Sequence, residues 1–143
     1  IAVTSASKAK ALLELGALKT IDRGDDLIAA IGANSADVVI DLVAGPQWPA
    51  LLDVLRPLGR HAVAGAIAGP IVELDVRTLY LKDLSFFGCT ILEPQVFKNL
   101  VKRIELKEIA PLVAETYPLR DIAKAQSVFG EKGHIAKIVL ELD

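Results

Sequence analysis

Hydrophobic and polar positions follow two rhythms along this chain, and together they predict short strands separated by amphipathic helices. Residues 6–15 carry apolar side chains at helical spacing and stop at Gly16, a residue typical of helix C-termini. The apolar stretch Ile1–Val3 predicts the end of a buried strand. The run Asp37–Val43 is apolar at successive positions, which is typical of a central strand buried on both faces of a parallel sheet.

The same alternation continues to the end of the chain. Further strands are expected at Lys19–Ile21, Arg60–Gly65, Ser85–Ile91 and in the tail segments AETYPL and AKIVLEL. Further helices are expected behind an Asp25 cap, from Trp48 to Leu55, from Pro94 onward and over RDIAKAQSVF. Strands that alternate with helices of about ten residues predict an α/β fold with a mostly parallel sheet. Because the rhythm changes near Pro111, we expect one domain over residues 1–110 and a strand–helix–strand tail over residues 111–143.

The composition narrows the class of protein. The 143 residues are 52% hydrophobic and 24% charged, with a net charge of −2 and the two signs interspersed, which argues against nucleic acid as a partner. No apolar run approaches the roughly 20 residues that a membrane helix needs, so no membrane partner is expected. The single cysteine, Cys89, rules out a disulfide within the chain and favours a reducing compartment, the cytoplasm.

The first polar turn is the main candidate for binding chemistry, because ligands of open α/β sheets bind beyond the carboxyl ends of the strands. Thr4, Ser5 and Ser7 supply hydroxyls at a helix N-terminus, and Lys8 adds a positive charge. This set suits a phosphate group. It equally suits an ordinary helix cap followed by a solvated lysine. The residues alone leave both interpretations open.

The other reactive side chains form no catalytic or metal-binding pattern. His61 and His134 lie far apart in sequence and have no second ligand at metal spacing. On apolar strands, His61 is expected to be a hydrogen-bonded structural residue and Cys89 a buried core residue. Asp41, inside the clearest strand, is expected to accept backbone hydrogen bonds. We therefore nominate no catalytic residue and no metal ligand.

Five segments, in this order, resemble one known family. They are AVTSASKAKALLELGALKTIDRGDD, ADVVIDLVAG, LLDVLRPLGRHAVAGAIAG, LKDLSFFGCTI and TYPLRDIAKAQSVFGEKGHIAKIVLEL. The ordered set resembles the later half of the medium-chain dehydrogenase/reductase superfamily, in the branch of quinone oxidoreductases and zinc-binding dehydrogenases. The resemblance implies a Rossmann-like, doubly wound parallel sheet that lacks its first strand and its glycine-rich pyrophosphate loop. It also implies that the chain is a fragment, or a protein reduced to that part.

The resemblance also implies a cofactor. In this family, dehydrogenases that prefer NAD carry an acid after the second strand, which binds the ribose diol. Here no acid stands between Val3 and Lys10, and Lys8 would pair with a 2′-phosphate, so NADP is expected. Arg23 would stack on the adenine or add a second positive charge. By position in the family, further cofactor contacts are expected at Leu42, Val43, Gly65, Ala66, Ile67, Gly88, Cys89, Thr90 and Lys132.

The function implied is NADPH-dependent hydride transfer to a quinone, enone or related carbonyl compound, with the catalytic groups outside this chain, which by itself is expected to be inactive. A portion of a zinc-dependent alcohol dehydrogenase and a non-enzymatic interaction module are the alternatives. The family also implies a homodimer through the edge strand Ser85–Ile91, which carries Phe86 and Phe87. The gap of the missing strand would be closed by direct pairing of its neighbours, by a swapped segment or by an upstream segment.

Overall fold

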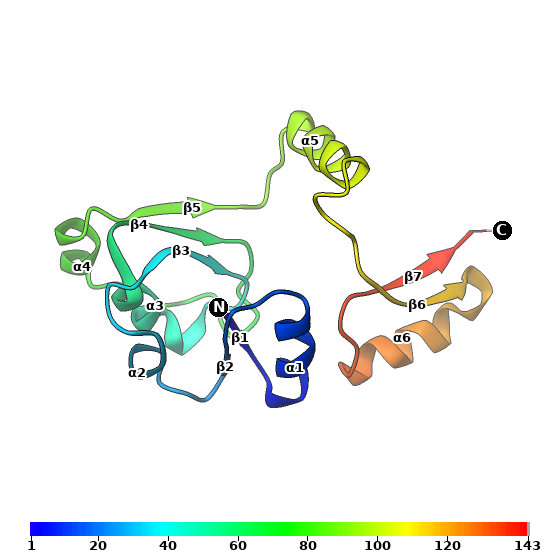
Figure 1. The fold of residues 1–143 in the computed structure, drawn as a ribbon, viewed down its shortest axis with the longest axis horizontal. Helices are drawn as coiled ribbons and strands as arrows, with labels where there is room; N and C mark the ends of the chain where they lie inside the picture. Colours follow the sequence, from blue (N-terminus) through cyan, green and yellow to red (C-terminus); the bar gives the residue numbers. More distant parts are fainter. Residues whose placement is uncertain (143) are drawn as a thin grey trace. The chain divides into compact units, whose positions relative to one another are not determined.

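The computed structural model describes residues 1–142 and divides into two compact units, one up to Ile91 and one from Leu92 onward (Figure 1). The first unit contains β1 (Ala2–Thr4), α1 (Ala6–Glu14), β2 (Thr20–Asp22), α2 (Leu27–Ile31), β3 (Ala36–Asp41), η1 (Gly45–Gln47), α3 (Trp48–Val54), β4 (Leu55–Val63), α4 (Val76–Leu81) and β5 (Ser85–Gly88). The second contains α5 (Pro94–Glu105), β6 (Val113–Pro118), η2 (Leu119–Asp121), α6 (Ile122–Glu131) and β7 (Lys137–Glu141). The alternation of strands and helices confirms the predicted α/β class.

Every strand pair in the described residues is parallel, and the strands form three small sheets. The first unit holds the pair β1–β2 and the three-stranded sheet β3–β4–β5, and the second holds the pair β6–β7. Within residues 1–142 no ladder joins β1 to β3. This arrangement matches a doubly wound sheet without the strand between β1 and β3, as predicted. Direct pairing of these two neighbours, one of the three expected ways of closing the gap, is therefore wrong for this structure.

The unfilled gap changes the burial expected for the strands beside it. β3 is a terminal strand of its sheet, and Val38 and Ile40 on it are 42% and 68% exposed, so the prediction of a strand buried on both faces is wrong. In β1 only Thr4 is buried, and Val3 is 42% exposed. Both strands thus expose apolar side chains, because each lacks a neighbour on one side.

The ends of the helices follow local hydrogen bonding. Gly16 follows α1 with a φ of +105°, a conformation that favours glycine. α2 is capped by Asp26, whose Oδ1 accepts hydrogen bonds from the amides of Ile28 and Ala29, at 2.9 and 3.1 Å. The predicted cap, Asp25, instead accepts a hydrogen bond from the Asp22 amide. The correction is one position, because the cap must directly precede the first helical residue, Leu27.

α3 ends at Val54, one residue before the predicted end at Leu55, and β4 begins at Leu55, well before the predicted strand start at Arg60. The Lys82 ammonium donates hydrogen bonds to the carbonyls of Leu52, Asp53 and Leu55, at 2.9–3.0 Å. These carbonyls lie at the C-terminus of α3, where a cation is favourable. The chain therefore leaves the helix at Leu55 with extended backbone and enters β4 directly.

The core of the first unit lies around α3. One cluster of buried residues comprises Ala44, Trp48, Leu52, Leu55 and Leu84, and a second comprises Ile21, Leu27 and Val54. Because α3 contributes Leu52 to the first cluster and Val54 to the second, it holds the sheet β3–β4–β5 together with β2 and α2. The core thus fixes the carboxyl ends of β2 and β3 in one compact unit.

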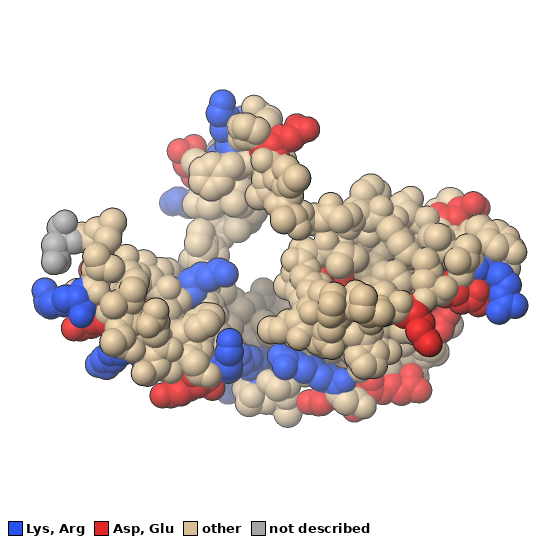
Figure 2. Space-filling view, turned by 180° about the vertical axis from the view of Figure 1, so that it is seen from behind, with Lys and Arg blue, Asp and Glu red and all other residues tan. Residues whose placement is uncertain are grey.

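In the second unit, α6 packs on β6 and β7, with Tyr117 and Ala125 buried. The predicted strand–helix–strand tail is present here, and the boundary expected near Pro111 falls inside this unit, between α5 and β6. No helix of the described chain is long and apolar enough to cross a membrane. On the face drawn in Figure 2, basic and acidic side chains are interspersed.

Candidate functional site

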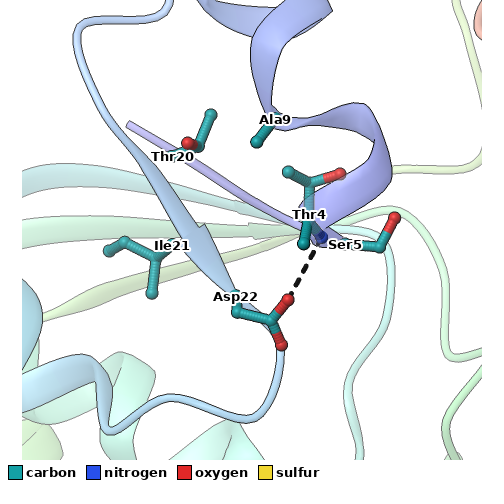
Figure 3. Close-up of a pocket in the computed structure, with 7 residues that line it drawn as sticks. Thr4, Ser5, Ala9, Thr20, Ile21 and Asp22 are labelled. Atoms are coloured by element: carbon teal, nitrogen blue, oxygen red, sulfur yellow. Dashed lines mark hydrogen bonds between the residues drawn. The ribbon is translucent and has the colours of Figure 1, made fainter.

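A pocket of about 210 Å³ lies at the carboxyl ends of β1 and β2 (Figure 3). Its lining consists of Thr4, Ser5, Ala6, Ala9, Thr20, Ile21 and Asp22. Two of the predicted binding residues, Thr4 and Ser5, thus line this pocket. Thr4 is only 5% exposed, and Ser5 stands at the position that precedes the first residue of α1.

The turn after β1 brings the predicted polar residues together. The Ser5 hydroxyl lies 3.1 Å from the Ser7 hydroxyl, and so it is not the backbone cap that sequence alone also allowed. The Lys8 amide donates a hydrogen bond to the Ser5 carbonyl at 3.0 Å, which places Lys8 on the first turn of α1. Ser7 and Lys8 therefore follow the pocket lining at the helix N-terminus, where an anion is favoured.

Asp22 is the charged residue of the pocket that sequence reasoning did not nominate as a contact. Its Oδ2 accepts a hydrogen bond from the Ala6 amide at 3.2 Å, shown as the dashed line in Figure 3, and its Oδ1 accepts one from Gly24 at 3.1 Å. The register of the parallel pair sets Asp22 directly opposite Thr4. One backbone amide at the start of α1 therefore already donates a hydrogen bond to a carboxylate within the chain. The parallel alignment of the two strand ends is the signal that could have predicted it.

The loops after β2 and β3 also meet. The Gln47 side-chain amide of η1 donates a hydrogen bond to the carbonyl of Arg23 at 2.6 Å. Arg23 itself is exposed and does not line the pocket. This contact shows that the carboxyl ends of β2 and β3 lie at the same edge of the first unit.

A second group of predicted residues lies at the carboxyl ends of β3 and β4. The Ala68 amide donates to the Val43 carbonyl at 2.9 Å, and the Ala64 amide donates to the Asp41 carbonyl at 2.8 Å. A Cβ at Gly65 would lie 2.6 Å from the Leu42 carbonyl oxygen. The structure therefore brings Leu42 and Val43 into contact with the loop that contains Gly65, Ala66 and Ile67.

Two buried ionisable residues, Asp41 and His61, lie beside the turn that follows β3. Asp41 accepts hydrogen bonds from the amides of Val43 and Ala44, at 2.8 and 2.9 Å, as predicted. His61 is fully buried, and its Nε2 lies 3.4 Å from the Asp41 Oδ2. Burial lowers the pKa of His61 although the nearby Asp41 carboxylate opposes this effect, so the ring is neutral at neutral pH. The expected full hydrogen bonding of His61 is wrong, because neither ring nitrogen has a hydrogen-bond partner in the described chain.

The last predicted group follows β5. The Cys89 amide donates to the Val63 carbonyl at 2.9 Å, which ties this turn to the end of β4. Cys89 is exposed rather than buried, because β5 ends at Gly88 and Cys89 lies beyond the sheet. Thr90 is also exposed. The registers align Asp41, Val63 and Gly88 across the sheet, so the three loops leave adjacent strand ends.

Lys132 belongs to the second unit. It ends α6 with a φ of +57°, and its ammonium lies 4.5 Å from the centre of the Phe129 ring. The structure thus gives its local surroundings, and its expected role near a cofactor stays a prediction. In the described residues no group of three or more His, Cys, Asp or Glu side chains could hold a metal ion.

The parallel strands, with glycine-bearing loops at their carboxyl ends, define a Rossmann-like nucleotide-binding class of fold. Residues 1–105 match the family described as zinc-binding dehydrogenase. The chain therefore belongs to this family, within the medium-chain dehydrogenase/reductase superfamily, as the five ordered segments predicted.

Known proteins similar to this chain support the assignment. A 2-haloacrylate reductase from Burkholderia sp is 28% identical and a quinone oxidoreductase from Lama guanicoe is 27% identical, over 96% and 82% of this chain. They are matched over 46% and 37% of their own lengths, so the chain spans less than half of these relatives. A solved structure from Sinorhizobium meliloti 1021, described as that of a candidate alcohol dehydrogenase, is 43% identical with a TM-score of 0.85, over 99% of this chain and 40% of that one.

Proposed function

We propose that this chain is the cofactor-binding portion of an NADPH-dependent oxidoreductase that transfers a hydride to a quinone, enone or related carbonyl compound. The observation that carries the proposal is that the registers align the carboxyl ends of β1 with β2 and of β3 with β4 and β5, and that the loops after β2 and β3 meet at the Gln47–Arg23 hydrogen bond. These strand ends and their loops hold every proposed contact of the first unit. A nicotinamide cofactor, when bound, supplies the hydride, and the protein binds and orients it. The similarity to a quinone oxidoreductase and a 2-haloacrylate reductase supports the acceptor class.

The adenosine end of the cofactor is assigned to the pocket between β1 and β2. Thr4, Ser5 and Ser7 offer hydroxyls to the ribose and its 2′-phosphate, and Lys8 offers the positive charge. Arg23, at the next strand end, would stack on the adenine or add a second charge. The preference for a 2′-phosphate rests on Lys8 and on the α1 N-terminus.

The rest of the cofactor would follow the sheet edge toward β5. Leu42 and Val43 would contact its adenine side, and the loop of Gly65, Ala66 and Ile67 would run beside it. Gly65 suits this position, since the loops already approach within a distance that excludes a Cβ. Gly88, Cys89 and Thr90 would lie near the nicotinamide. No residue of the chain is proposed as catalytic.

One observation favours a second candidate, a portion of an NAD-dependent, zinc-containing alcohol dehydrogenase. The Asp22 carboxylate lies in the pocket and accepts the Ala6 amide. A carboxylate in this place would repel a 2′-phosphate and could accept hydrogen bonds from a ribose diol. The choice between the two cofactors therefore depends on whether the positive charge of Lys8 or the negative charge of Asp22 has the larger effect on the binding of a 2′-phosphate.

A titration of two matched variants tests the cofactor assignment. In a full-length version of the protein, Lys8→Ala should weaken the binding of NADPH by about 1–3 kcal/mol, the range for charge-assisted contacts, and should leave the binding of NADH almost unchanged. Lys10→Ala is the control, because Lys10 is on the same helix with a 91% exposed side chain. Equal losses for NADPH and NADH in Lys8→Ala, or an equal effect of Lys10→Ala, would contradict the assignment to NADP.

We also propose that the protein forms a homodimer through β5. This strand is terminal in its sheet and carries Phe87, which is 48% exposed. Ser85, Phe86 and Phe87 present neither charge nor proline, the usual obstacles to pairing at a sheet edge. Phe87→Lys should shift the sedimentation coefficient of the protein to that of a monomer. A wild-type chain that sediments as a monomer over the whole concentration range would refute this assembly.

A further inference from the structure

The contact between Asp41 and His61 lies beneath the turn Leu42–Gly45 and is not itself one of the proposed cofactor contacts. We propose that His61 is a positioning residue that acts through Asp41, holding this turn in the single conformation that faces the cofactor. The proposal rests on the proposed function only for the identity of what the turn contacts. Its structural part concerns this chain alone.

The two oxygens of the Asp41 carboxylate have different neighbours. Its Oδ1 accepts hydrogen bonds from the amides of Val43 and Ala44, at 2.8 and 2.9 Å. Its Oδ2 faces the ring of His61, with 3.4 Å to Nε2. A rotation of the carboxylate away from His61 would also turn Oδ1 away from the two amides. Contact with His61 therefore favours the orientation that supports the turn.

The ring of His61 is fixed by packing on both sides. It lies on β4, in register between Val39 of β3 and Phe86 of β5. Its centre is 5.0 Å from that of Trp48 and 5.6 Å from that of Phe86. Within the described residues neither ring nitrogen has a partner with hydrogen-bond geometry, nor does the Oδ2 of Asp41, and the contact that brings the two side chains together is the 3.4 Å approach of Nε2 to Oδ2. A buried polar group without a hydrogen-bond partner is costly, so an apolar side chain would suit this packing better. The contact with Asp41 is the polar interaction that a histidine at this position provides.

The turn itself needs such support. Ala44 has a φ of +53° and Gly45 a φ of +77°, so two successive residues lie in the left-handed region, which is unfavourable for alanine. A Cβ at Gly45 would lie 2.8 Å from the Cβ of Ala68, so the turn is also pressed against the next loop. The two hydrogen bonds to Asp41 hold this conformation in place.

Amide hydrogen exchange of the whole chain, followed by NMR, tests the proposal. His61→Phe keeps an aromatic ring and removes the donor, and should speed exchange of the Val43 and Ala44 amides roughly tenfold or more. The Cys89 amide, bonded to Val63 at the neighbouring strand end, is the internal control and should change much less. His61→Gln keeps an N–H donor and should restore part of the protection.

The ring of the wild-type protein provides a second measurement that needs no substitution at His61. The nitrogen chemical shifts of His61 should show the tautomer with its proton on Nε2, the atom that faces Asp41. His134→Gln assigns the signals, because the chain has two histidines. A proton on Nδ1, unchanged exchange in His61→Phe, or an equal rise at Val43, Ala44 and Cys89 would overturn the proposal. Failure of NADPH to bind the wild-type chain would instead refute the proposed function and leave these results intact.

Discussion

Gly65→Ala tests the close approach of two loops on which the cofactor site is built. A Cβ at Gly65 would lie 2.6 Å from the Leu42 carbonyl oxygen and 3.2 Å from its carbonyl carbon. Both are backbone atoms, so no flexible side chain can move aside. Overpacking of this kind costs about 1–3 kcal/mol. Because Gly65 lacks a positive φ, alanine returns about 0.4–1 kcal/mol by restricting the unfolded chain, and a net loss of roughly 1–2 kcal/mol is expected.

The assay is urea denaturation of Gly65→Ala beside Gly88→Ala. A Cβ at Gly88 would meet no atom within 4 Å in the described chain, and its φ is also not positive, so this control should be neutral or slightly more stable than the wild type. The Gly65 variant should also alter the amide signals of Leu42 and Val43. Equal midpoints for the two variants, with unchanged signals at Leu42 and Val43, would refute the loop-contact argument.

Further predictions concern the caps, acid stability and activity. Lys82→Met removes three hydrogen bonds to α3 carbonyls and should lower the free energy of unfolding by about 1.5–3 kcal/mol, whereas Lys10→Met should change it little. Asp26→Ala should cost α2 about 0.5–2 kcal/mol and Asp25→Ala clearly less, as measured by denaturation. Burial lowers the pKa of His61 in the folded protein, so on acidification the histidine of the unfolded chain is protonated first. The free energy of unfolding should therefore fall as the pH drops below about 6.5, and it should fall less in His61→Gln, as measured by denaturation at several pH values. The purified chain should show no saturable oxidation of NADPH by quinones; measurable turnover would contradict the view that catalytic groups lie outside it.

Much of the fold could be predicted because its elements depend on local patterns. The alternation of apolar runs and helical spacing predicts the α/β class, and Gly16 and Pro94 mark helix ends where the structure has them. α4 was not predicted, although its six residues, Val76–Leu81, exceed the five of α2, which was predicted from its apolar face and an acidic cap. Its cap, Asp75, accepts a hydrogen bond from the Arg77 amide and was the available signal.

The ends of the strands could not be predicted from periodicity. β3 stops at Asp41 because the carboxylate of that residue bonds the next amides and turns the chain. β4 runs through Pro57, although the strand was expected to begin only at Arg60. A shift in register between β3 and β4 accommodates the proline, since the pairing resumes only at Arg60.

The candidate site was likewise predictable where it depends on local sequence and not where it depends on strand pairing. The hydroxyl-bearing turn was predictable, since Thr4, Ser5 and Ser7 follow one strand directly. Asp22 was not, because its position in the pocket depends on the pairing of β1 with β2 across a whole helix. The exposure of Cys89 likewise depends on where β5 ends.

The most direct test of the central claim is an NMR titration of the isotope-labelled chain with NADPH and, separately, with NADH. We predict that NADPH binds more tightly and shifts the amide signals of Thr4–Lys8, Leu42–Val43, Gly65–Ile67 and Gly88–Thr90 along one common binding curve. Such agreement would mean that a single ligand spans the strand ends of the first unit. Signals that stay unchanged with both nucleotides, or shifts confined to the second unit, would contradict the claim that these loops bind a nicotinamide cofactor.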